Sequence, residues 1–281
     1  MPDGGDLSAP SCGPGRPDIC GIFDGSLEGF LSVIHEHYYR KMDFLYICEE
    51  AEYQQALDAE YVFVSTDYPK SRKVFEAVRN KISPRAESNV YHCYLSADKR
   101  KYMAMYDYLL LGFRVGADVD KHLQNDSVLL VHKLAGHVGK EAHLLKGFCR
   151  FRETAQGVYY ASISPENNPL PILAEHFRER LMNQAWIIHD QSHGMAAVYD
   201  GKDYIISEVP VNIDIEQADR DENYQELWRA FFNTIAISER KNSKLQQRHI
   251  PLRYRKHMTE FIPVIKKQPK TAIENKTNGS E

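Results

Sequence analysis

The feature that most constrains the fold is a helical repeat that gives way to a strand pattern. Between residues 126 and 147, apolar residues recur at alternating intervals of three and four positions: Val128, Val131, Ala135, Val138, Ala142 and Leu145. This spacing places them on one buried stripe of a helix. Asp126 or Ser127 is expected to cap this helix, and Gly147 to follow its end. After Gly147 the alternation has a period of two, so the chain must combine helices with a sheet.

Capping residues and apolar spacing predict several elements before this helix. The segments Asp18–Phe23 and Tyr61–Val64 have the composition of strands. Three helices are expected, each starting at a residue that can cap it: 27–41 after Ser26, 68–81 after Thr66 or Asp67, and 97–111 between Ser96 and Gly112.

Beyond the long helix, short strand-like segments separated by turns predict a sheet. A hairpin is expected around Gln156–Gly157, and a three-strand meander over 185–189, 195–199 and 203–207. Helices are expected at 172–181, at 219–237 and, shorter, from Pro251. Because helices and strands are partly segregated, the predicted class is α+β, with an antiparallel sheet of hairpin-linked strands packed with several amphipathic helices.

Length and composition predict a single α+β domain at residues 18–262. The chain has 281 residues, of which 43% are apolar and 26% charged, as in ordinary globular proteins. Residues 1–17 are rich in Gly, Pro and Ser and are expected to form a disordered leader, and residues 263–281 a polar disordered tail. No segment has the roughly 20 apolar residues of a membrane span, and the leader lacks the apolar stretch of a secretion signal.

The cysteines and the glycine patterns argue against common cofactor sites. The five cysteines, at positions 12, 20, 48, 93 and 149, are odd in number, and no two are separated by two residues. A disulfide framework or a structural metal site is therefore not expected, and the thiols are predicted to be reduced in a cytoplasmic protein. The sequence contains neither a Walker loop nor a GxGxxG motif, the two common phosphate-binding glycine patterns, so no nucleotide cofactor is expected.

Positive charge is concentrated near the C-terminus of a chain whose net charge is −4. Seven cations lie between Glu239 and Glu260: Arg240, Lys241, Lys244, Arg248, Arg253, Arg255 and Lys256. We call residues 243–258 the basic segment. Guanidinium groups match phosphate geometry and aromatic rings stack on bases. The predicted nucleic-acid contacts in this segment are Lys244, Gln247, Arg248, Arg253, Tyr254, Arg255 and Lys256. A solvated basic helix face would have the same composition.

A second basic feature follows the long helix. Arg150 and Arg152 alternate in a strand-like segment, so they are expected on one strand face. Such an arginine ladder suits phosphate binding. The alternative is that these arginines pair with acids such as Glu153 or Glu175.

Four side chains are candidates for chemistry: Glu141, His143, His189 and Asp190. Glu141 lies one turn from His137 on the long helix, and a Glu–His pair can bind a metal or move protons. Such pairs are also common on helix surfaces. His189–Asp190 superficially resembles the dyad of metal-dependent phosphohydrolases, but that site needs further distant ligands, and no metal is predicted here.

The long helix also carries His132, Gly136, Gly139 and His143 on one stripe. Two glycines there would let another element approach closely. The stripe is expected either to contact a ligand or to pack tightly on the sheet with its histidines partly buried, and we favour packing.

Several separated segments together resemble one family. They are Phe23–Phe30, Val138–Arg152, Tyr159–Asn168, Trp186–Asp190, Tyr199–Gly201 and Leu245–Tyr254. They resemble a bacterial family of DNA-repair or DNA-metabolism proteins long classed as a domain of unknown function. Members are typically encoded beside a radical-SAM protein of DNA modification or repair, and some are fused to a uracil-DNA-glycosylase-like domain. One departure is Leu144, where a basic residue is expected.

The resemblance implies a context without a mechanism. The chain lacks the three-cysteine motif of a radical-SAM cluster, so this enzyme would be a separate partner. The first hypothesis is an accessory protein that binds DNA through the basic segment and acts with that partner. The second is a nucleic-acid hydrolase or lyase that uses Glu141, His143, or His189 with Asp190. The third is a protein–protein adaptor without DNA affinity.

Overall fold

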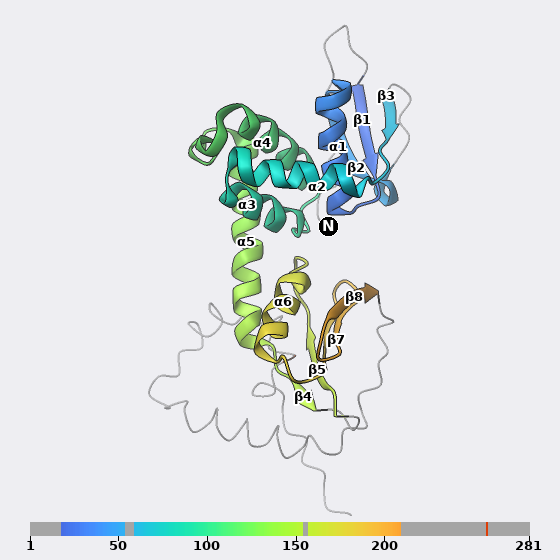
Figure 1. Ribbon diagram of the computed structural model, residues 1–281, viewed down its shortest axis with the longest axis vertical. Helices are drawn as coiled ribbons and strands as arrows, with labels where there is room; N and C mark the ends of the chain where they lie inside the picture. The colour runs from blue at the N-terminus through green and yellow to red at the C-terminus, as the bar shows by residue number, and fades with distance from the viewer. Residues whose placement is uncertain (1–17, 54–58, 154–156, 209–256, 258–281) are drawn as a thin grey trace, which may run out of the picture. The chain divides into compact units, whose positions relative to one another are not determined.

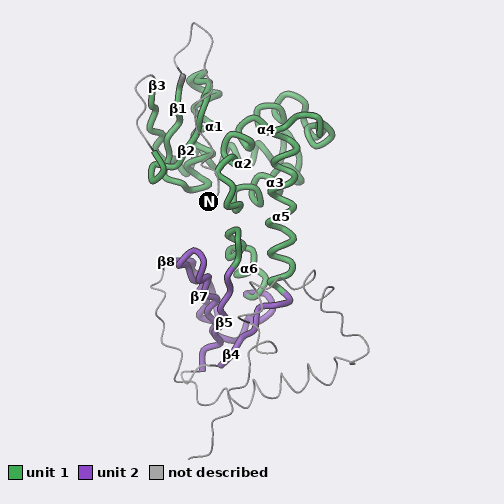
Figure 2. The backbone as a smooth tube through the Cα atoms, turned by 180° about the vertical axis from the view of Figure 1, so that it is seen from behind, with its two compact units in different colours: residues 1–146, 165–177 green, residues 147–164, 178–281 purple. Residues whose placement is uncertain are grey.

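The computed structural model describes residues 18–53, 59–153, 157–208 and 257. The chain divides into two compact units, one of residues 1–146 with 165–177 and the other of residues 147–164 with 178–281 (Figure 2). The helices expected at 219–237 and from Pro251 lie outside the described residues. None of the described helices combines the length and the apolar composition needed to cross a membrane.

The first unit begins with a parallel sheet, in contrast to the antiparallel arrangement expected. Strands β1 (Asp18–Phe23), β2 (Phe44–Glu49) and β3 (Ala59–Phe63) lie in the order β2-β1-β3, and β1 pairs in parallel with both neighbours. Helix α1 (Leu27–Arg40) joins β1 to β2 (Figure 1). A helical crossover of this kind returns the chain to the same end of the sheet, which makes the strands parallel.

The rest of the first unit is helical. Helix α2 (Tyr68–Ala77) runs into a π-turn at Val78–Ile82, followed by α3 (Pro84–Tyr94), α4 (Lys101–Val115), a 3₁₀ turn at Gly116–Lys121 and most of α5 (Asp126–Phe148). Helices α1, α4 and α5 pack together and contribute side chains to the core of this unit: Phe30, Val33, Ile34, Met105, Leu109, Val128 and Val131. The long helix and its buried stripe are thus confirmed.

Several expected helix boundaries need correction. Helix α4 begins at Lys101 and not near residue 97, because the Ser96 hydroxyl accepts a bond from the Asp98 amide in a turn before the helix. Gly112 lies inside α4, where it allows close packing: an added Cβ would come within 2.7 Å of Ile82 Cδ1. Asn125 caps α5, since its side chain accepts a bond from the Val128 amide at 3.1 Å.

The second unit contains a mixed sheet in the order β4-β5-β6-β7-β8. Its strands are β4 (Arg152–Glu153), β5 (Tyr159–Ile163), β6 (Trp186–Asp190), β7 (Met195–Tyr199) and β8 (Tyr204–Glu208). The expected hairpin and meander are confirmed as antiparallel pairs. The β5–β6 pair is parallel, because the chain between them passes through α6 (Leu170–Arg180) instead of a tight turn. Trp186 stacks on its cross-strand partner Tyr199 in the core.

Candidate functional site

One face of the second sheet carries a group of polar side chains. Tyr160 and Ser162 are two residues apart on β5, so their side chains point to the same face, and Ser164 follows in the same alternation. Strand pairing adds Arg152, which is opposite Tyr160, and His189, which is opposite Ser162. We call Arg152, Tyr160, Ser162, Ser164 and His189 the polar sheet face.

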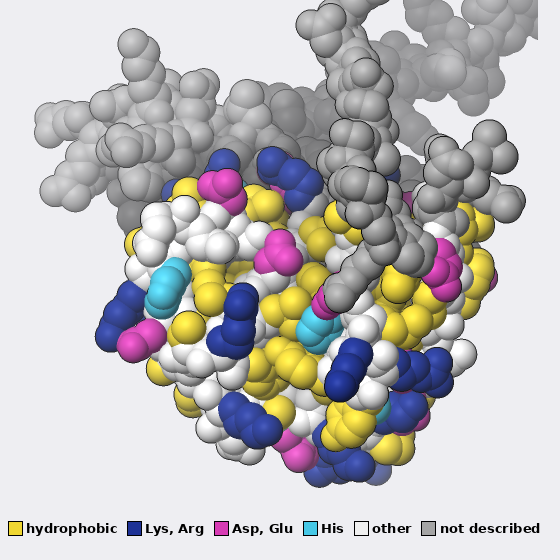
Figure 3. All heavy atoms as spheres, turned by 90° about the horizontal axis from the view of Figure 1, so that it is seen from above, with side chains coloured by type: hydrophobic (Ala, Val, Ile, Leu, Met, Phe, Trp, Pro, Cys, Tyr) yellow, Lys and Arg dark blue, Asp and Glu magenta, His cyan; other side chains and the backbone are white. Residues whose placement is uncertain are grey.

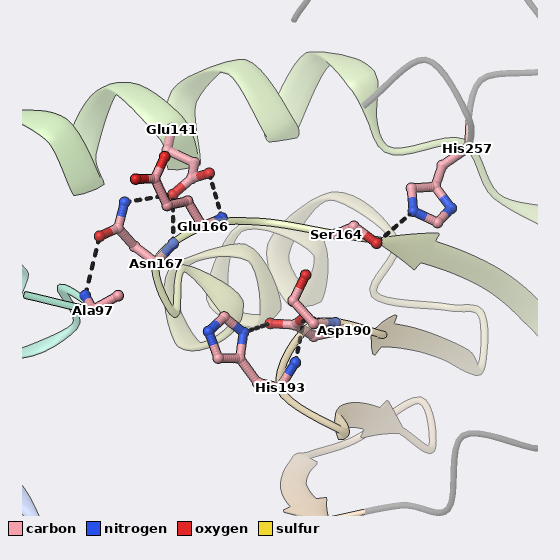
Figure 4. A network of polar contacts seen from close by, with 9 residues as sticks. Ala97, Glu141, Ser164, Glu166, Asn167, Asp190, His193 and His257 are labelled. Atoms are coloured by element: carbon pink, nitrogen blue, oxygen red, sulfur yellow. Dashed lines mark hydrogen bonds and ion pairs between the residues drawn. The ribbon is translucent and has the colours of Figure 1, made fainter. Parts of the chain in front are cut away.

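His257 bonds to this face through both ring nitrogens. Its Nδ1 lies 2.9 Å from Ser162 Oγ, and its Nε2 lies 2.8 Å from Ser164 Oγ. Figure 4 shows the ring beside Ser164 at the end of β5. A neutral imidazole has one N–H donor and one acceptor nitrogen, so one serine accepts a bond while the other donates. His257 is the one residue of the basic segment that the structure describes, and it contacts the sheet at this point.

His189 lies next to this anchor and is 1% exposed. Its Nδ1 is 2.8 Å from the Tyr160 hydroxyl, while Nε2 has no partner among the described residues. Burial lowers the pKa of His189, and the adjacent Asp190 carboxylate opposes this shift. The ring is therefore neutral at physiological pH, and its free nitrogen can accept or donate one further hydrogen bond.

The two arginines have different surroundings. The Arg152 guanidinium lies 5.5 Å from the centre of the Tyr160 ring, in a cation–π contact on the polar sheet face. Arg150 precedes β4, so only Arg152 belongs to the strand, and the Arg150 Nη1 donates to the Gly147 carbonyl oxygen at 2.6 Å. Arg150 thus closes the end of α5, a role typical of basic residues at helix C-termini.

His189 and Asp190 do not form one site, because adjacent strand residues point to opposite faces. The Asp190 carboxylate is fully buried and accepts bonds from the backbone amides of Ser192 and His193. It also lies 2.7 Å from the His193 ring (Figure 4). These bonds hold the turn between β6 and β7. Within the described ranges, no group of three or more His, Cys, Asp and Glu side chains could hold a metal ion.

Glu141 and His143 differ in burial and in what they contact. The buried Glu141 carboxylate accepts bonds from the Glu166 and Asn167 amides at 2.8 and 3.0 Å, and from the Asn167 side chain at 2.6 Å (Figure 4). The Asn167 side chain in turn accepts a bond from the Ala97 amide. Glu141 therefore fixes the loop before α6 onto α5. His143 is exposed on α5. A Cβ built at Gly139 would lie 3.8 Å from His92 Cδ2, an ordinary contact, and one built at Gly136 would meet no atom of another described element within 4 Å, so a very close approach is not seen at either glycine.

The remaining predicted nucleic-acid contacts, namely Lys244, Gln247, Arg248, Arg253, Tyr254, Arg255 and Lys256, lie outside the described residues. On the face drawn in Figure 3, Lys and Arg side chains are mixed with acidic and hydrophobic ones. Sequence reasoning missed Tyr160, Ser162, Ser164 and His257 as site residues. The alternation of polar residues along 160–164 was the available signal, but it does not indicate a partner 93 residues away.

Comparison with known protein families gives a match. The sequence model of a family described as a domain of unknown function, DUF4130, matches residues 99–260. This range includes every residue of the polar sheet face and His257. Among curated proteins, none matches the chain.

Proposed function

The chain belongs to the DUF4130 family, whose description assigns no function, and we propose that it is an accessory protein of DNA repair or DNA metabolism that binds DNA. The basic segment and Arg152 would contact phosphates, and a separate radical-SAM protein would act on the same DNA. The radical-SAM partner is proposed because the sequence resembles a family whose members are typically encoded beside such a protein. The DNA-binding part has a structural argument of its own.

The observation that supports DNA binding most is the double hydrogen bond of His257 to the polar sheet face. Because a residue advances the chain by at most about 3.6 Å, connectivity alone limits the Cα separations of Arg255 and Arg253 from His257 to about 7 and 14 Å. We infer that the contact of His257 brings the basic segment to the sheet that carries Arg152. Concentrated cations of this kind attract the DNA backbone even when the net charge of the protein is negative.

The polar sheet face also has features that suit a nucleic-acid ligand. The Arg152 guanidinium lies over a phenol ring, and among the described residues it forms no ion pair with a carboxylate, so its charge is available to a phosphate. The serine hydroxyls contribute by holding His257, and with it the start of the proposed phosphate contacts, against this face. The catalytic alternative has less support, because the Glu141 and Asp190 carboxylates already accept several N–H bonds each.

The double substitution of Ser162 and Ser164 by alanine tests the anchor without removing a charge. Each hydrogen bond contributes about 1 kcal/mol, so we expect DNA affinity to fall about five- to thirtyfold as the basic segment loses its attachment. Fluorescence anisotropy with labelled single- and double-stranded DNA measures the change. The control is Ser207→Ala, which removes an exposed hydroxyl on the same sheet face. Equal affinity of the double variant and the control would contradict the proposal.

A further inference from the structure

A second group of ionisable side chains lies in the first unit, around the first residue of α4. The Lys101 ammonium lies 4.9 Å from the centre of the Tyr102 ring and 5.4 Å from that of Tyr94. Its Nζ donates a hydrogen bond to the Ser96 carbonyl oxygen at 2.8 Å. The side chain is only partly exposed. Lys101 is therefore held in one place by two rings and one carbonyl group.

The two rings tie Lys101 to the carboxyl ends of the parallel strands. The Tyr94 hydroxyl donates to the carbonyl oxygen of Gly25, just after β1, at 2.9 Å. The Tyr102 hydroxyl donates to the carboxylate of Glu49, the last residue of β2. Sheets of parallel strands bind their ligands at this edge. Lys101 thus lies beside the end of the sheet where a small molecule is expected.

The carboxylates near Lys101 are bonded to other groups. Glu52 pairs with Lys99 at 2.8 Å, Asp98 pairs with Arg100 at 2.6 Å, and Glu49 accepts the Tyr102 hydroxyl. Within the described part of the chain, Lys101 has no ion pair of its own. The charges that act on it come from the acids Glu49, Glu52 and Asp98 and from the thiol of Cys93. The tyrosines Tyr94 and Tyr102 contact it through their rings.

The surroundings of Lys101 favour the neutral form of its amine more than water does for an exposed lysine. Burial lowers the pKa of Lys101, and the nearby carboxylates, Glu49 first, only partly offset this. The N-terminus of α4 carries partial positive charge and also disfavours an ammonium there. Two tyrosine rings act in the opposite direction, since they attract a cation. If Lys101 has only a structural cation–π role, it stays charged and unreactive. If its amine is partly neutral, it can act as a nucleophile.

We propose that Lys101 is a nucleophilic amine that forms an imine with an aldehyde bound at the carboxyl end of the first sheet. The Nζ lone pair attacks the carbonyl carbon, and the C=O π pair moves to oxygen, which takes a proton. The amine nitrogen loses its first proton to give a carbinolamine. The hydroxyl of that carbinolamine then takes up a second proton and departs as water while the nitrogen lone pair forms the C=N bond, and the nitrogen loses its second proton. Amine and aldehyde thus give imine and water without an oxidant.

The neighbouring hydroxyls suit these proton transfers. Burial raises the pKa of Tyr94 to about 12, and burial together with the Glu49 carboxylate raises that of Tyr102 further. Both phenols are therefore protonated at neutral pH, and each keeps lone pairs on its oxygen that can accept a proton. Glu49 accepts the Tyr102 hydroxyl, so when this hydroxyl takes up a proton lost by the amine nitrogen it can pass its own proton to Glu49.

Two sources could supply the aldehyde: a small free sugar, or the open-chain sugar at an abasic position in DNA. The second source rests on the proposed DNA binding, whereas imine formation does not. Glyceraldehyde and an oligonucleotide with one abasic position are the matching probes. Each is added to the full chain with cyanoborohydride, which reduces an imine to a stable amine, and modified lysines are identified by peptide mass spectrometry.

Lys99 is the internal reference, because it lies two residues away and is far more exposed. At pH 7.5 we expect glyceraldehyde to modify Lys101 at least about tenfold faster than Lys99, with a difference that shrinks as the pH rises toward the range of ordinary lysines near 10.4. Equal or slower modification of Lys101 would overturn the proposal. This comparison within the wild-type chain needs no variant to fold.

Variants then separate the two sources. Lys101→Met is expected to abolish the trapped protein–DNA adduct at the abasic position, while Lys99→Met keeps it, and circular dichroism checks that both fold. Modification of Lys101 by glyceraldehyde without a DNA adduct would support imine chemistry and assign it to a small aldehyde. A DNA adduct that persists in Lys101→Met would overturn the assignment of the amine to Lys101.

Discussion

At the scale of single residues, glycines with similar backbone conformations differ in what surrounds them. Gly29 lies in the first turn of α1, and a Cβ there would come within 2.3 Å of Asp24 Oδ1 and 2.9 Å of Thr66 Oγ1. Asp24 is held in this position by the Ser26 and Thr66 hydroxyls, each at 2.6 Å. Gly136 on α5 has open space around it in the described structure.

These surroundings predict opposite effects of the same substitution. Gly29→Ala forces Asp24 out of its bonds and should lower the free energy of unfolding by about 1–3 kcal/mol. Gly136→Ala gains only the better helix propensity of alanine and should raise it by about 0.5–1 kcal/mol. Urea denaturation of the two variants measures both signs. A stabilising Gly29→Ala would contradict the described packing around α1.

Residues also set the limit of what the sequence could predict about the site. Arg152 and His189 were predicted as site residues, because charged and titratable side chains are visible in a sequence. Tyr160, Ser162 and Ser164 are common strand residues, and only strand pairing and the contact with His257 distinguish them. The role of Glu141 was unpredictable for the same reason, since its partners belong to a loop 25 and 26 residues later.

At the scale of elements, helices with clear caps and strong stripes were predictable. The stripe of α5 and the caps Ser26 and Asp67 are as expected. Strand β2 was missed because its burial does not alternate, as the register of the β1–β2 pair shifts after Ile19. Helix α3 was missed although Ser83 and Pro84 form an ordinary helix start. Parallel pairing in both sheets depends on crossovers, which local patterns do not reveal.

The burial of His189 on β6 should make the stability of the fold depend on pH. Since burial depresses the pKa of His189, the unfolded chain takes up a proton near pH 6.5 before the folded chain does. Stability is therefore highest above that pH and falls as the pH decreases, by at most about 1.4 kcal/mol per pH unit for one proton.

The variant His189→Asn isolates this effect, because an amide can keep the bond to Tyr160 but cannot titrate. We expect the stability advantage of the wild type over this variant to shrink between pH 7 and pH 5, as measured by urea denaturation at each pH. Other titrating groups cancel in this difference. An advantage that stays constant or grows toward pH 5 would mean that His189 is not held neutral.

At the scale of the whole molecule, positive charge is distributed unevenly along the chain. The chain has a net charge of −4, and the described surface in Figure 3 mixes both signs, while cations gather in the basic segment. A protein of this kind should bind DNA through few phosphates and therefore with a modest salt dependence. Each phosphate contact on duplex DNA adds about 0.9 to the slope of log affinity against log salt.

The measurement that tests the central claim most directly is a salt series of DNA binding by anisotropy, comparing the wild type with the triple variant Arg248→Ala, Arg253→Ala, Arg255→Ala. We expect salt-sensitive binding by the wild type, and in the triple variant a large loss of affinity with a slope smaller by up to about 2.7 units, or three contacts at about 0.9 each. Unchanged melting of the variant is the control for folding. Wild-type binding that is absent at low salt, or a triple variant with unchanged affinity and slope, would contradict the claim that the basic segment binds DNA.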